Sequence, residues 1–150
     1  MSTATLSSPR TTNSNDQGEL YCIAVPATRS AVRVARESVQ AILRPYPELI
    51  DDACVCISDA IAFTLAEMPE HPTVTVTVWF RRAYVAFVIE DGDGPSHALY
   101  HLTPKNIADA PMLAITRQTA IYLGVCRVWD GHRRATRVYL ELPIEGQVPA

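Results

Sequence analysis

The amino-acid sequence predicts an α+β fold: a two-layer sandwich in which a mixed, mainly antiparallel sheet is covered on one face by three helices. Two observations carry this prediction. Strand-like segments come in two successive pairs, each joined by a short turn, and such pairs form antiparallel hairpins. Three other segments have apolar residues at helical spacing, so each has one face that must be buried against the sheet.

The two ends of the chain differ in composition from the part between them. Residues 1–19 are rich in Ser, Thr and Asn and poor in large apolar residues, so they lack the side chains that build a core. We therefore expect a disordered N-terminal tail at 1–19, one domain at 20–144 and a short C-terminal tail at 145–150.

The domain is expected to begin with a strand at 20–25, which Pro26 ends. A helix follows, and Pro45 and Pro47 stop it, because proline lacks the N–H that a helix interior requires. The apolar residues of this helix recur at helical spacing: Val32, Ala35, Val39 and Ile42. Three arginines lie on its other faces: Arg29, Arg33 and Arg36.

The strongest helical pattern in the chain covers 47–68. One apolar stripe runs along it: Ile50, Ala53, Cys54, Ile57, Ile61, Leu65 and Met68. A hairpin with strands at 73–79 and 84–90 comes next, and Thr and Val alternate strictly along its first strand, which is typical of a half-buried strand.

A long loop is expected at 91–110, where Gly, Pro, Asp and His follow no period. A third helix is predicted at 111–123, with Pro111 suited to its first turn. A second hairpin, with strands at 125–129 and 136–142, completes the domain. The predicted order of elements is therefore β-α-α-β-β-loop-α-β-β.

The composition is that of a globular protein without a membrane-spanning segment. Of the 150 residues, 48% are hydrophobic and 19% are charged, and no apolar run approaches the roughly 20 residues of a membrane helix. The N-terminus lacks the charged-then-apolar order of a signal peptide, and the four cysteines are placed as packed, reduced thiols rather than as a disulfide framework. We expect a cytoplasmic protein.

The charge balance argues against nucleic acid as the default partner. The formal net charge is −3, whereas nucleic-acid binding depends on neutralising phosphates. Two pairs of arginines, 81–82 and 133–134, fall in predicted hairpin turns. They could contact phosphates together only if both turns emerged at one end of the sheet.

Three short segments carry candidate functional residues. On the second helix, residues 58–64 read Ser-Asp-Ala-Ile-Ala-Phe-Thr. Its Asp59 and Phe63 are four residues apart, so they share one face of the helix, opposite the apolar stripe. Residues 89–95, after the second strand of the first hairpin, read Ile-Glu-Asp-Gly-Asp-Gly-Pro, and residues 110–113 read Ala-Pro-Met-Leu.

With the order of elements, these segments resemble the GHKL-type ATP-binding fold, and more narrowly the small bacterial anti-sigma-factor serine kinases. The resemblance covers about residues 21–142. In that family the helix motif is close to Ser-Glu-Leu-Val-x-Asn-Ala, where the Glu is the general base and the Asn holds magnesium on the ATP phosphates. The resemblance puts Asp59 at the base position and Phe63 at the metal position, and phenylalanine has no oxygen to offer a hard cation.

The other two motifs are kept unequally. The resemblance implies that Asp91 stands where the family reads adenine, with Gly92 and Gly94 in the turn that follows; taken alone, these residues are also typical of a tight turn. Residues 110–112 stand where the family has Gly-x-Gly, which lets helix amides approach the phosphates, and Pro111 removes one such amide. We expect no cofactor and no metal, with ATP bound at most weakly and without magnesium.

These replacements predict a regulatory protein similar to the anti-sigma factors that is catalytically inactive and acts by protein–protein binding. The alternative is an ATP-binding serine/threonine-protein kinase, an anti-sigma factor that retains nucleotide binding. The resemblance implies a sigma factor, an anti-sigma antagonist or another regulatory protein as the partner, and it is compatible with a homodimer. Neither a membrane nor a nucleic acid is expected to bind.

Two regions are candidates for the contact with a partner. The first is the side of the first helix that carries Arg29, Arg33 and Arg36, which would otherwise be an ordinary solvated face. The second is the loop at 91–110, where the apolar residues include Leu99 and Tyr100. Such residues must pack against something. They either fill the vacant nucleotide pocket, with Phe63 in its floor, or contact a partner.

Overall fold

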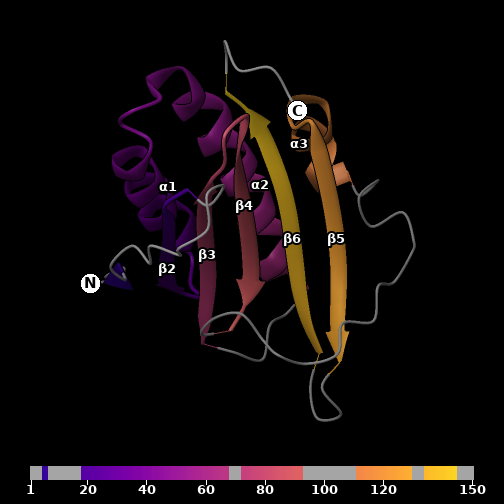
Figure 1. Ribbon diagram of the computed structural model, residues 1–150. Helices are drawn as coiled ribbons and strands as arrows, with labels where there is room; N and C mark the ends of the chain where they lie inside the picture. The colour runs from indigo at the N-terminus through magenta and orange to yellow at the C-terminus, as the bar shows by residue number, and fades with distance from the viewer. Residues whose placement is uncertain (1–4, 7–17, 68–71, 93–110, 130–133, 145–150) are drawn as a thin grey trace.

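The structure, a computed structural model, describes residues 5–6, 18–67, 72–92, 111–129 and 134–144 (Figure 1). Its elements, with η for a 3-10 helix, follow the chain in this order: β1 (Thr5–Leu6), β2 (Leu20–Pro26), α1 (Ala31–Ile42), η1 (Pro47–Leu49), α2 (Ile50–Ala66), β3 (Thr73–Phe80), β4 (Tyr84–Asp91), η3 (Pro111–Leu113), α3 (Ala114–Thr119), β5 (Tyr122–Trp129) and β6 (Arg134–Pro143).

The described strands form one sheet in the order β1-β2-β3-β4-β6-β5. Each pair of neighbours in this sheet is antiparallel. Figure 1 looks onto the strands, with α1 and α2 behind them. The predicted α+β two-layer sandwich is thus confirmed, and the described part of the sheet contains only antiparallel pairs.

The core lies between the sheet and the two long helices. On β3, Val74, Val76 and Val78 alternate with Thr residues and are fully buried, because successive side chains of a strand point to opposite faces. Ile57 and Ile61 of α2 are also fully buried and belong to the same cluster. The strict Thr-Val alternation therefore placed this strand and its inner face correctly.

The buried stripe of α1 differs from the prediction at three positions: Ala31 and Val34 belong to it, and Val32 does not. Val34 is buried, whereas Val32, which the spacing had assigned to the apolar stripe, is only half-buried. The fully or nearly buried positions of the helix are Ala31, Val34, Ala35, Val39 and Ile42. Val32 therefore lies at the border between the core and the arginine side of the helix.

The third helix is shorter than predicted, and this part of the prediction was wrong. Helical structure covers η3 and α3 and ends at Thr119, and β5 already begins at Tyr122. The Ile121 N–H donates to the Glu141 carbonyl oxygen at 3.0 Å, and Tyr122 pairs with Glu141. The strand begins early because β6 offers backbone hydrogen bonds to residues that have apolar side chains compatible with either structure.

Part of the predicted N-terminal tail lies in the described structure as strand β1. Thr5 pairs with Ala24 and Leu6 with Ile23, so β1 lies at the edge of β2. The remainder of the predicted N-terminal tail before Gly18, and the predicted tail at 145–150, lie outside the described residues. None of the helices in the described ranges is long and apolar enough to cross a membrane.

Candidate functional site

Asp59, the residue at the predicted base position, lies where α3 packs against α2. Its side chain is half-buried, and its Oδ2 accepts a hydrogen bond from Thr116 Oγ1 of α3 at 3.3 Å. Thr116 itself is fully buried. The carboxylate therefore joins two helices, a structural role that the motif alone did not indicate.

Cys56 completes this junction one turn earlier on α2. Its side chain is fully buried. Burial raises the pKa of its thiol to about 11, while a hydrogen bond with Thr116 offsets part of this effect and the nearby Asp52 and Asp59 charges add to it. The raised pKa keeps the thiol neutral at physiological pH, whereas the nucleophilic form of cysteine is the thiolate.

Phe63 is buried rather than exposed in an open cleft. Its side chain is 5% exposed and belongs to the hydrophobic core cluster. The face of α2 that the sequence placed opposite the apolar stripe is therefore also covered. Within the described ranges, no group of three or more His, Cys, Asp or Glu residues is placed to hold a metal ion.

Asp91 is the last residue of β4, and the chain bends directly after it at Gly92. Asp91 is 7% exposed. Gly92 has a φ of 117°, a backbone conformation that residues other than glycine adopt only with strain. The Gly92 N–H donates to the Thr73 carbonyl oxygen at 2.8 Å, and Thr75 Oγ1 donates to the Gly92 carbonyl oxygen. These bonds tie the turn to β3 and account for the glycine without a ligand.

Residues Pro111–Leu113, which include two of the three positions predicted to replace a Gly-x-Gly motif, form a short 3-10 helix packed on α2. Leu113 is fully buried in the core, while Pro111 and Met112 are exposed, Met112 to 43%. Ala110 lies outside the described residues, as do Gly94, Leu99, Tyr100 and the rest of 93–110. The predicted roles of these residues therefore stay predictions.

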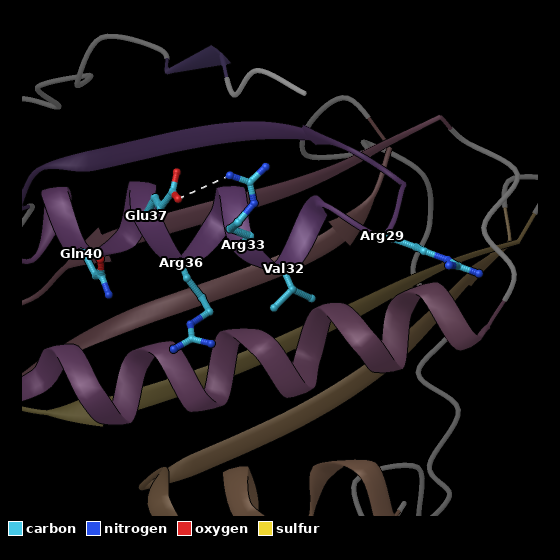
Figure 2. A pocket seen from close by; sticks show the side chains of 6 residues that line it. All are labelled: Arg29, Val32, Arg33, Arg36, Glu37 and Gln40. Carbon is cyan, nitrogen blue, oxygen red and sulfur yellow. Dashed lines mark ion pairs between the residues drawn. The ribbon is translucent and has the colours of Figure 1, made fainter. Parts of the chain in front are cut away.

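The three predicted partner-binding arginines line one hollow on the outer side of α1. The hollow has a volume of about 520 Å³ and is lined by Arg29, Val32, Arg33, Arg36, Glu37 and Gln40. Figure 2 shows Val32 and Arg36 directed toward α2, with Arg33 and Glu37 on the other side of α1. The hollow therefore extends from Arg29, which precedes α1, along that helix to Arg33 and Arg36, whose side chains point to opposite sides of it.

The charges of this hollow are mostly positive and exposed. Arg33 forms an ion pair with Glu37 at 3.8 Å, with side chains 69% and 66% exposed (Figure 2). Glu37 and Gln40 were not singled out in the sequence. Glu37 comes four residues after Arg33, and Gln40 comes four residues after Arg36, so each lies on the same side of the helix as its arginine. Such an exposed pair contributes little to stability.

A comparison of the sequence with protein-family models and with curated proteins finds no match to either.

Proposed function

We propose that the protein is a regulatory domain of the anti-sigma-factor-like ATPase-domain type that binds a partner protein and does not transfer phosphate. The observation that carries the proposal is the burial of Phe63. At this position the resembled family needs an amide oxygen for magnesium, and a buried ring supplies apolar packing instead. Metal-bridged phosphates supply much of the binding and catalysis in such sites.

The engagement of Asp59 supports the same proposal. A general base must be within hydrogen-bond reach of the proton that it removes. The Asp59 carboxylate already accepts a hydrogen bond from Thr116, and the side chain of Thr116 is fully buried. The residue at the base position thus stabilises the packing of α3 on α2.

The arginine hollow of α1 is the proposed contact surface. Its three arginines would attract acidic side chains of a partner. The proposed partner is a sigma factor, an antagonist or another regulatory protein. A second copy of the chain is a further candidate for this role.

One observation favours the alternative, an anti-sigma-factor kinase that retains nucleotide binding. Asp91 is 7% exposed at the end of β4, and Gly92 with its positive φ follows directly. A buried carboxylate beside a glycine turn is the feature with which the resembled family reads adenine. The bonds of Gly92 to β3 explain the turn equally well.

Charge reversal on α1 tests the proposed contact. The full chain, wild type or Arg36→Glu, is used to capture partners from a nuclease-treated lysate at moderate salt, and captured proteins are quantified by mass spectrometry. Arg44→Glu serves as the matched control because Arg44 is exposed but does not line the hollow. We expect a protein that Arg36→Glu loses and Arg44→Glu retains. Equal capture by all three chains would remove α1 from the account.

A further inference from the structure

The two edges of the sheet differ in what covers them. At one edge, β1 pairs with Ile23 and Ala24 of β2, whereas β5 ends the sheet at the other edge (Figure 1). Among the described residues, no strand pairs with β5 on the side away from β6. Alternate residues of such an edge strand direct their backbone N–H and C=O groups away from the sheet, where a further strand can pair with them.

Exposed apolar side chains gather at this same edge. Five large hydrophobic side chains of the described structure are exposed, and four of them lie within residues 112–122: Met112, Ile115, Ile121 and Tyr122. Met112 and Ile115 are three residues apart in the helical segment that packs beside β5, so they share one side of it. Ile121 and Tyr122 follow where the chain enters β5. Apolar side chains gathered in this way mark an interaction site, whereas single ones need no explanation.

The apolar residues of β5 itself are incompletely covered. Leu123 pairs with Leu140 of β6, and Val125 pairs with Val138. The two β6 residues are fully buried, whereas Leu123 and Val125 pack against the core but stay half-buried. A further strand beside β5 would cover both of these side chains as well as pair with the backbone of the strand.

We propose that β5 pairs antiparallel with β5 of a second copy of this chain, which forms a two-fold symmetric dimer with one continuous sheet. Residues directly opposite each other in a sheet point to the same face, so the two-fold axis must pass through a residue of β5. With the axis at Val125, the exposed Tyr122 lies opposite Val128 of the second copy. With the axis at Cys126, Tyr122 would lie beyond the end of the second β5. The register centred on Val125 therefore covers more of the exposed apolar surface.

The edges of the described sheet select a second copy as the occupant. Because β1 covers the middle of the β2 edge, β5 is the edge that both copies can offer along its whole length. Pairing of β5 with itself uses the same surface on both chains, so the assembly closes at two copies instead of growing into a filament. The dimer thus covers both β5 edges at once.

The charges of β5 permit this pairing. Arg127 alone among its eight residues is charged. In the register centred on Val125, it lies opposite Leu123 of the second copy. The two Arg127 positions are then four residues apart along the strands, about 13 Å. This separation exceeds the Debye length of about 8 Å at physiological ionic strength, so their repulsion is largely screened.

The dimer is expected to be weak and independent of the proposed partner. It pairs residues 122–128 of each β5 and adds the side of α3, fewer than the about 20–30 residues per chain of a standard interface. We therefore expect a dissociation constant on the order of 10–100 μM. The arginine hollow lies on α1, which packs beside β2 at the other edge of the sheet. Whatever binds the hollow does not compete with the second copy.

Sedimentation equilibrium of the full chain, from about 5 to 500 μM, tests the proposal. The average mass of the wild type should rise with concentration toward twice that of one chain. Val125→Lys places two ammonium groups opposite each other at the axis, and it should weaken dimerisation about tenfold or more. Val55→Lys is the matched control, because Val55 is 41% exposed but lies on α2, and it should dimerise like the wild type.

A second variant tests the register without a buried charge. In Val125→Cys the two substituted side chains face each other with Cβ atoms about 4.5–5.5 Å apart, close enough for a disulfide after a small adjustment. Mild oxidation followed by peptide mass spectrometry should detect a disulfide between the two 125 positions. Half-buried Cys22 on β2 reports on the other edge of the sheet in the same sample.

Three results would overturn the proposal. They are a wild type that stays monomeric throughout the concentration range, an equal weakening of the dimer by Val55→Lys, and a disulfide through Cys22 in place of position 125. A monomeric wild type that still captures a partner protein through α1 would leave the proposed function intact.

Discussion

Helices α1 and α2 pack against each other on the same side of the sheet, yet they present different surfaces. On α2 the side chains at the predicted base and metal positions are engaged in packing: Phe63 is 5% exposed, and half-buried Asp59 is bonded to Thr116. On α1 the arginines stay exposed around a hollow, with one weak ion pair between Arg33 and Glu37.

This difference separates the residues that stabilise the fold from those that remain exposed for recognition. Buried side chains on α2 contribute to the free energy of folding through apolar burial, whereas exposed charges on α1 contribute little to it. A surface that does little for stability can be used for recognition. We therefore expect substitutions on α2 to lower stability and substitutions on α1 to leave it nearly unchanged, and four experiments test this contrast.

The largest effect is expected from Phe63→Ala. Removing a buried ring leaves a cavity in the core, and such truncations lower the free energy of unfolding by about 3 kcal/mol or more. Urea unfolding of the wild type and the variant measures this difference. Val55→Ala is the control on the same helix, since Val55 is 41% exposed, and it should change stability by less than about 0.5 kcal/mol. Equal effects of the two changes would mean that the Phe63 ring faces an open cleft.

The next largest effect is expected in the rates at which iodoacetamide alkylates the individual cysteines, measured as a function of pH. The pKa of Cys56 is about 11 instead of 9.0. At neutral pH its thiolate fraction is therefore about one hundredth of that of an unshifted cysteine. Iodoacetamide labelling of the native chain, followed by peptide mass spectrometry, should modify half-buried Cys22 and Cys126 long before Cys56 at pH 8. Rates for Cys56 should keep rising with pH toward 11. Early labelling of Cys56 would show that α3 does not cover α2.

A smaller effect is expected at the junction of α2 and α3. The bond from Thr116 to Asp59 should contribute about 1 kcal/mol, the usual value of one hydrogen bond. Asp59→Ala, Thr116→Val and the double variant form a cycle in which unfolding free energies give the coupling between the two side chains. A coupling of zero would show that the bond does not hold the helices together, and would return Asp59 to the list of candidate bases.

The smallest effect is expected from Arg33→Ala on α1. Both partners of its ion pair are more than half exposed, so the change should alter the unfolding free energy by less than about 0.5 kcal/mol. Thermal unfolding at low and high salt measures it. A loss above 1 kcal/mol would assign α1 a structural role and remove the contrast with α2.

Much of the fold could be predicted because it depends on local patterns. The alternation in β3 and the long apolar stripe of α2 identify both elements and their inner faces. The end of the third helix could not be predicted, because the apolar residues Ile121 to Leu123 suit a helix or a strand, and only the distant Glu141 decides between them.

The candidate site was less accessible to sequence reasoning. Helical spacing puts Arg29, Arg33 and Arg36 outside the apolar stripe of the first helix, and the structure shows all three lining one hollow. It also predicts that Phe63 faces away from the Ile57 and Ile61 stripe, but it does not reveal that this second face is buried as well. Thr116 was missed because a single threonine in a short helix carries no local signal; its role arises from the packing of α3 on α2.

The most direct test of the central claim is a calorimetric titration of the full chain with ATP, with and without magnesium. With a buried ring at the predicted metal position, magnesium should not strengthen binding, and no micromolar affinity should appear in either titration. Micromolar binding that requires magnesium would contradict the account, since it would place an intact nucleotide site where we infer apolar packing.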